Sequence, residues 1–231
     1  MRREPKSPLD HIDRWFRLDM PFPRFLLNTL YAALAGLLPV LAVFVARSPG
    51  FAEHLVRDPD AALRLARQIV TNGVPVIFAV NFIGFALFAG RGNRGAMGAL
   101  AIDLAARPVA FIGLHAVIYP ASALWFGSFG GDPAQALTVL GPTLAQSAAF
   151  ANLSGVYLYA TALGALPLLI SALVAALRDE RPAGQLLRRA IGRYPGAGRL
   201  ALAVGFALMS YLAIMASLVT IGGWLLIAAI P

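Results

Sequence analysis

The last stretch of the chain carries the clearest hydrophobic pattern. From Leu200 to Pro231 no side chain is charged, and this stretch directly follows an arginine-rich segment, residues 178–199. About 20 apolar residues suffice to cross a hydrocarbon core of about 30 Å. The pattern therefore predicts a final transmembrane helix, with a break near Gly222 and Gly223 because an unbroken helix would exceed that thickness. Since short basic loops stay in the cytoplasm, this helix should run from inside to outside.

Four further apolar stretches predict four more spanning helices, over residues 25–46, 69–90, 108–127 and 155–177. An amphipathic pattern in residues 1–24 predicts a helix that lies in the membrane interface. Residues 25–231 form the transmembrane helical domain. The predicted fold class is all-α, a polytopic transmembrane helix bundle of about five spans, with six as the alternative count.

The uncharged stretch from Pro133 to Leu177 leaves the span count open. If both halves of this stretch crossed the membrane, the arginine-rich segment 178–199 would face outside, contrary to the charge rule. We therefore expect residues 134–152 to form a re-entrant or interfacial segment on the outer side. Such a segment must be buried in protein or line water, which makes it a candidate for function.

The segments between the spans predict two short helices. Asp58 followed by Pro59 is typical of a cap and a first helical residue, and this helix should run into the second span. Residues 95–107 predict a short surface helix that carries Asp103. Within the spans, small residues four positions apart predict close helix packing, in the pairs Ala32 with Gly36, Ala160 with Gly164 and Ala201 with Gly205.

Composition agrees with a membrane protein: 59% of the residues are hydrophobic, 13% are charged and the net charge is +8. Soluble domains are nearer a quarter charged. The basic residues lie beside predicted helix ends, where they serve as topology signals and contacts for anionic lipid, so no nucleic-acid partner is predicted. All basic residues except Lys6 are arginine, which we interpret as the codon usage of a GC-rich bacterium. The predicted location is the bacterial inner membrane, with the N-terminus cytoplasmic and the C-terminus periplasmic.

Candidate chemistry is sparse. No Asp, Glu, Lys or Arg falls inside the predicted spans, which argues against a proton- or sodium-coupled transporter and against paired-carboxylate catalysis. The chain has no cysteine, so thiolate metal sites are excluded. His115, with Tyr119 one turn later, is expected to pack against a neighbouring helix. The alternative is a pigment or haem ligand; in the packing interpretation, replacing His115 with Ala leaves assembly and absorption spectrum unchanged.

Two sets of residues are the candidates for binding. Possible ligand or pore residues are the polar side chains in or near the spans: Asn81, His115, Tyr119, Gln146 and Asn152. Possible partner- or lipid-docking residues are the arginines before the last span: Arg178, Arg181, Arg188, Arg189 and Arg193. No catalytic residue, metal or cofactor is predicted.

The sequence supports a leading hypothesis and two alternatives. The leading hypothesis is a non-catalytic membrane subunit or assembly component of a larger complex, because few polar groups are buried and several small-residue faces are available. Its expected partners are the lipid bilayer, anionic headgroups and other membrane subunits. The alternative is a permease or channel component for a neutral or apolar solute. The third is a lipid-modifying enzyme, for which no catalytic base is evident.

Overall fold

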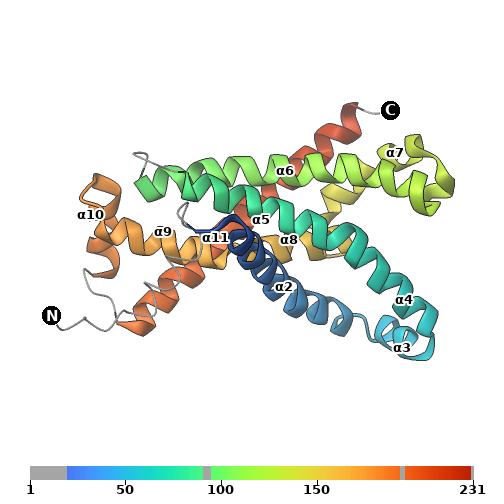
Figure 1. Cartoon of the computed structure of the whole chain (residues 1–231), viewed down its shortest axis with the longest axis horizontal. Coiled ribbons are helices and arrows are strands. Elements are labelled where there is room, and N and C mark those ends of the chain that lie inside the picture. The colour runs from blue at the N-terminus through green and yellow to red at the C-terminus, as the bar shows by residue number, and fades with distance from the viewer. Residues whose placement is uncertain (1–19, 91–94, 193–195, 230–231) are drawn as a thin grey trace.

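The structure of the chain is a computed structural model that describes residues 20–90, 95–192 and 196–229, without the side chains of residues 125, 126, 128 and 129. All regular elements of this part are helices (Figure 1). Five helices are long and apolar enough to cross a membrane. The predicted fold class, an all-α polytopic bundle, is therefore confirmed. The interfacial helix predicted for residues 1–24 lies almost wholly outside the described residues.

The five candidate spans follow one another along the chain. The first is α2 (Phe22–Ala46), the third is α6 (Gly95–Phe126) and the fifth is α11 (Ala197–Ala229). The second combines α4 (Pro59–Gln68), the π-helical turn η1 (Ile69–Gly73) and α5 (Val74–Ala89), and the fourth combines α8 (Leu153–Gly164) and α9 (Leu166–Arg178). Shorter elements connect them: α3 (Pro49–Arg57), the 3-10 turn η3 (Ser128–Gly131), α7 (Pro133–Ser147) and α10 (Pro182–Ile191).

The helix predicted at Asp58 is confirmed. The Asp58 carboxylate accepts a hydrogen bond from the backbone N–H of Asp60 at 2.9 Å, which satisfies a free donor at the start of α4. The helix then runs through η1 into α5, where Pro75 is a second-position residue. The backbone N–H of Val74 donates to the carbonyl of Ile69, five residues earlier, so the turn is widened directly before the proline, which has no N–H to donate.

The surface helix predicted for residues 95–107 is wrong. These residues are the first half of α6, which continues without interruption past Pro108. Asp103 and Arg107 are 0% exposed and form an ion pair. A helix can carry the two charges into the core because they lie four residues apart on one face and neutralise each other.

The break predicted at Gly222 and Gly223 is also wrong, because α11 is a single helix. A side chain at Gly223 would collide with the backbone of Ala145 in α7, and one at Gly141 would collide with the backbone of α11. The glycine therefore allows α7 and α11 to approach closely instead of interrupting the helix. The long helix crosses the bundle and ends beyond α6 and α7 (Figure 1).

Residues 134–152 form α7 and the turn that follows it. α7 has 15 residues and packs against α6 and α11. It is not among the five candidate spans, so the count of five holds for the described residues. Whether this segment is re-entrant or interfacial stays a prediction.

Two of the three small-residue pairs meet each other. A side chain at Gly36 in α2 would collide with the backbone of Ala160 and Gly164 in α8, so the two helices touch at their backbones. This confirms close packing for both pairs. The third pair differs, because Ala201 and Gly205 are exposed and nothing lies within 4 Å of a side chain built at Gly205.

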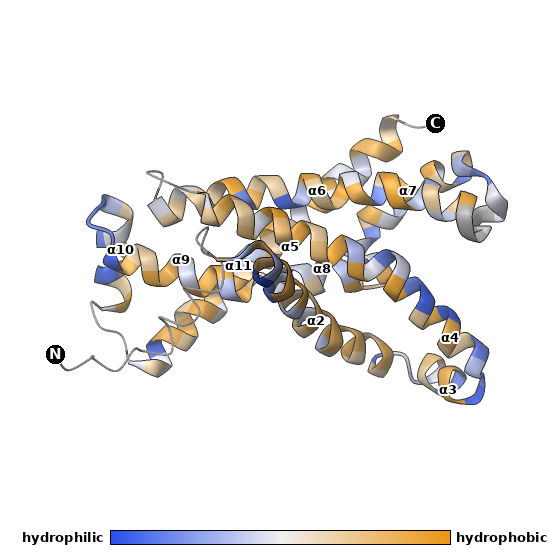
Figure 2. Ribbon diagram, in the orientation of Figure 1, coloured by the Kyte–Doolittle hydropathy of each residue, from blue (hydrophilic) through white to orange (hydrophobic). Residues whose placement is uncertain are grey.

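The arginine-rich segment contains an amphipathic helix, α10. It ends at Gly192, whose φ of 92° favours glycine. A side chain at Gly95 would meet Asp179 and Arg181, so the start of α6 lies beside the start of this segment. Polar residues gather at α10 and again at α3 and α4, on either side of an apolar middle (Figure 2).

Candidate functional site

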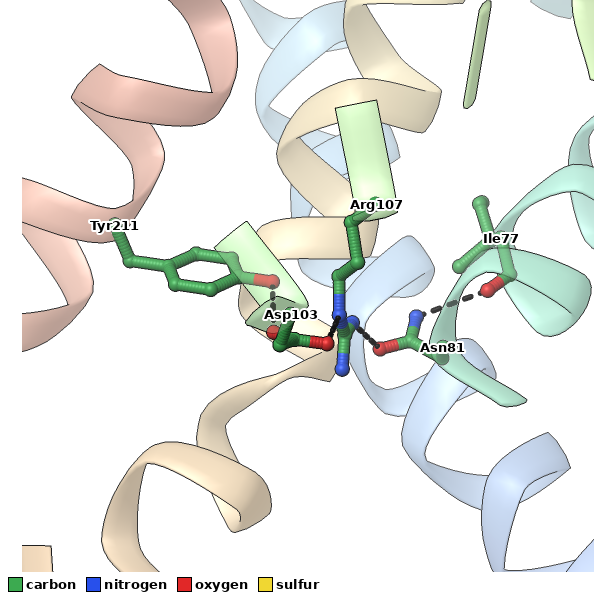
Figure 3. A network of polar contacts seen from close by, with 5 residues as sticks. All are labelled: Ile77, Asn81, Asp103, Arg107 and Tyr211. Carbon is green, nitrogen blue, oxygen red and sulfur yellow. Dashed lines mark hydrogen bonds and ion pairs between the residues drawn. The ribbon is translucent and has the colours of Figure 1, made fainter. Parts of the chain in front are cut away.

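A buried polar network joins α5, α6 and α11 (Figure 3). At its centre, Arg107 Nε donates to Asp103 Oδ1 at 2.7 Å. The other carboxylate oxygen, Oδ2, accepts from the hydroxyl of Tyr211 at 2.8 Å. Arg107 Nη1 donates to Asn81 Oδ1 at 2.6 Å, and Asn81 Nδ2 donates to the carbonyl of Ile77 at 2.9 Å. Three helices are thereby tied together by groups that cannot reach water.

The guanidinium of Arg107 lies between aromatic rings. Its central carbon is 5.4 Å from the ring centroid of Phe85 and 5.8 Å from that of Tyr211, within the range of cation–π attraction. Gly84 leaves the room for this arrangement, because a side chain there would collide with Arg107 and Asp103. Arg107 Nη2 is the one nitrogen of the group without a hydrogen-bond partner among the described residues.

The geometry of this network favours a fixed ion pair. Asp103, Arg107 and Asn81 are each 0% exposed, and both carboxylate oxygens of Asp103 already have donors. A carboxylate that carries protons needs a path to water and an open hydrogen-bonding position. The arrangement instead suits an ion pair that holds the helices in register, although removing its two charges from water costs free energy.

A second buried cluster joins α6 to α8. His115 Nδ1 lies 2.8 Å from the carbonyl oxygen of Phe111, and Nε2 lies 3.2 Å from Ser154 Oγ. The hydroxyl of Tyr119 lies 3.0 Å from the same serine oxygen. His115 and Ser154 are each 1% exposed. The rings of Phe111 and Tyr157 also pack against the imidazole, with centroids 4.3 Å and 6.4 Å away.

The proton positions of this cluster follow from its partners. A carbonyl only accepts, so His115 Nδ1 carries the hydrogen and donates to Phe111. In a neutral ring Nε2 then accepts from the Ser154 hydroxyl, and Ser154 Oγ accepts from Tyr119 in turn. All three side chains are satisfied with a neutral imidazole, and both ring nitrogens have protein partners.

Comparison with known proteins adds no family to this picture. No protein-family model, curated protein or solved structure matches the chain. Within the described ranges, no group of three or more His, Cys, Asp or Glu side chains could hold a metal ion. The function is therefore argued from the two polar clusters and the surfaces around them.

The candidate pore residues do not converge on one site. Asn81 belongs to the Asp103–Arg107 network, whereas His115 and Tyr119 belong to the second cluster. Asn152 caps α8, where its Oδ1 accepts from the N–H of Gly155 at 2.8 Å. It also borders a pocket of about 520 Å³ between α2, α3, α4 and α8. Gln146 is exposed on α7.

The candidate docking arginines have separate surroundings. Arg188 Nη1 donates to the carbonyls of Leu177 and Asp179 at 2.9 and 2.6 Å, so it caps the end of α9. Arg181 Nε lies 3.8 Å from the carboxylate of Asp179. Arg178 and Arg189 are exposed. Arg193 lies outside the described residues.

Arg107, Tyr211 and Ser154 were not predicted as site residues, and Asp103 was predicted to lie on the surface. One signal was present: Asp103 and Arg107 stand four residues apart in a segment that is otherwise apolar. This spacing predicts a neutral pair, which can continue into a core, whereas both residues were assigned to a short surface helix. Tyr211 and Ser154 had no signal, because their partners come from other helices.

We expect the His115→Ala variant to lose about 2–3 kcal/mol of unfolding free energy, because the change leaves a cavity and two unpaired polar groups. This differs from the sequence-based expectation that assembly stays unchanged. The Tyr119→Phe variant removes one hydroxyl only and should lose about 1 kcal/mol. Unfolding of both variants in detergent, followed by circular dichroism, checks the order of the losses.

The same variant addresses the pigment or haem alternative. We expect the native protein and His115→Ala to have the same visible absorption spectrum, because both ring nitrogens contact protein groups. A visible band that disappears with the imidazole would contradict the packing interpretation.

Proposed function

We propose that this chain is a non-catalytic subunit or scaffold component of a larger membrane complex. The supporting observation is the outer face of α11. Ala201 and Gly205 lie on it with open space around Gly205, and Met209, one turn further along the same face, is 63% exposed. The same type of small-residue pair joins α2 to α8 inside the bundle. A partner helix could approach α11 in the same way.

The buried polar groups are consistent with this proposal. Asp103 and Arg107 pair with each other and with Asn81 and Tyr211, and His115 is satisfied by Phe111 and Ser154. Intramembrane ionisable residues mark function by default. The Asp103–Arg107 pair is enclosed by protein, and the function that best fits these surroundings is structural. The pair would hold α11 in place, so that the outer face of α11 can bind a partner helix.

We propose the bacterial inner membrane as the location, with α10 on the cytoplasmic side. α10 and the start of α6 lie at the same end of the bundle, opposite α3, α4 and α7 (Figure 1). In the sequence, Arg91 and Arg94 directly precede α6, and residues 178–199 with their arginines include α10. Because basic loops stay in the cytoplasm, α11 would then run outward and five spans would place the C-terminus in the periplasm.

The scaffold proposal predicts a partner that depends on Gly205. Purification in a mild detergent or in nanodiscs, followed by mass spectrometry, should give a fixed stoichiometric ratio to another membrane protein. We expect Gly205→Leu to abolish this co-purification, because the larger side chain prevents close helix approach. Gly113→Leu is the matched control: Gly113 is an exposed glycine of α6 that also has open space around it.

Two results would speak against a subunit role. One is a native chain that purifies alone and monodisperse under conditions that preserve membrane complexes. The other is a partner that stays bound to Gly205→Leu as well as to Gly113→Leu. In either case solute-flux measurements in liposomes become the decisive experiment.

A permease or channel component for a neutral or apolar solute is the second candidate. The observation in its favour is the pocket of about 520 Å³, whose polar lining residues Asn152, Gln68, His54 and Arg64 stand among apolar side chains. Flux of a neutral solute through the isolated native chain, reduced by Asn152→Leu, would favour this candidate over the scaffold.

A further inference from the structure

A second pocket lies on the other face of α11. It encloses about 690 Å³ between α6, α9, α10 and the first half of α11. This volume is within the range of roughly 300–1,000 Å³ that is usual for small-molecule sites. Its wall is apolar, with leucines from four helices, and its polar side chains among the described residues are Arg199, Ser210 and Tyr211.

Arg199 and Tyr211 mark the two ends of the pocket along α11. They are 12 positions apart in one helix, which corresponds to roughly 18 Å at about 1.5 Å per residue. One leaflet of a bilayer has about 15 Å of hydrocarbon, half of the core of about 30 Å. The pocket therefore has the length of a single acyl chain that starts at the headgroup level.

The deep end of the pocket is apolar in practice. The hydroxyl of Tyr211 donates to Asp103 Oδ2 at 2.8 Å, so the hydrogen-bonding group is used and the ring remains as wall. Leu104, which follows Asp103 in α6, also lines the pocket. An occupant with a polar group at this end would find no free partner in Tyr211.

The shallow end is positively charged. Arg199 is exposed and, among the described residues, makes no hydrogen bond or ion pair. Arg188 and Arg189 belong to α10, whose Leu187 and Ile191 form part of the pocket wall. A phosphate at this end would receive charge-assisted hydrogen bonds from a guanidinium.

We propose that this pocket binds one acyl chain of an anionic membrane phospholipid, with the lipid phosphate on Arg199 and the chain end at Tyr211. An apolar pocket alone would accept any lipid, whereas the arginine at its mouth selects the anionic headgroup. Ala201 and Gly205 do not line this pocket, because they face away from it on α11, whereas their neighbours Leu202 and Phe206 border it.

Lipid retention tests the headgroup part of the proposal. The purified chain in zwitterionic detergent is mixed with equal amounts of phosphatidylglycerol and phosphatidylcholine, and native mass spectrometry counts the bound lipids. We expect one phosphatidylglycerol per chain. Arg199→Gln should weaken its retention about fivefold, as loss of one surface arginine contact implies. Arg67→Gln removes an exposed charge from α4, which does not line the pocket, and should retain the lipid.

A second variant tests the acyl chain part. Ala203→Trp fills the pocket and should abolish retention of the bound lipid. Ala201→Trp carries the same change on the opposite face and should retain it, and thermal unfolding of both variants verifies that they fold. Equal retention of the two headgroups by the native chain, or equal lipid binding by the two tryptophan variants, would overturn the proposal. Co-purification of a free fatty acid in place of phospholipid would overturn the assignment of its source.

Discussion

The Asp103→Leu variant should lose about 3–5 kcal/mol of unfolding free energy. The change leaves Arg107 charged in a site that is 0% exposed, and removing one partner of a buried ion pair costs an amount of this order. It also takes the hydrogen-bond acceptor away from Tyr211. The free energy can be measured by reversible unfolding in mixed micelles with increasing dodecyl sulfate.

A triple variant separates the charge effect from a simple packing effect. Asp103→Leu, Arg107→Leu and Tyr211→Phe together remove both charges and the hydroxyl, and replacing a buried pair with apolar groups is often neutral or stabilising. We expect this variant to recover most of the loss. A triple variant as unstable as the single one would show that the shape of the site matters more than its charge.

The second large effect is expected at the contact of α2 with α8. Gly36→Val should lose about 3 kcal/mol, because overpacking of a close contact is destabilising and the opposing atoms at Ala160 and Gly164 are backbone, which cannot rotate away. Unfolding under the same conditions as above measures the loss.

Gly113→Val is the matched control for this prediction. It makes the same change in an exposed glycine of α6 that has nothing within 4 Å of the added carbon. We expect a loss within about 0.5 kcal/mol for such an exposed site. Equal losses at Gly36 and Gly113 would mean that helix propensity, and not the contact with α8, accounts for the effect.

The ion pair also changes one argument about function. The predicted spans contained no charged residue, and this argued against ion-coupled transport. Asp103 and Arg107 remove that premise. Ion coupling is now disfavoured by geometry, because the Asp103 carboxylate accepts from two donors and has no exposed surface. The Asp103→Leu variant and its triple counterpart are therefore also the variants to examine first in a flux assay.

The sequence alone determined the class of the fold and the position of most spans. Long uncharged stretches predict membrane helices because the bilayer thickness sets their length, and this signal is local. The Asp58 cap and the amphipathic α10 were predictable for the same reason, since each depends on residues within a few turns. The small pairs at Gly36 and Gly164 were visible as candidates, although nothing local showed that they meet.

Only the tertiary structure decided what the polar residues do. The network takes its residues from three helices: Asn81, the Asp103–Arg107 pair and Tyr211. Tyr211 in α11 follows its partner Asp103 by 108 positions in the sequence. Gly222 and Gly223 predict a break when read locally, but the contact with α7 makes Gly223 a packing residue. A membrane helix must satisfy its polar groups within the protein. The partner that satisfies each group is chosen by helix packing, which no single stretch of sequence contains.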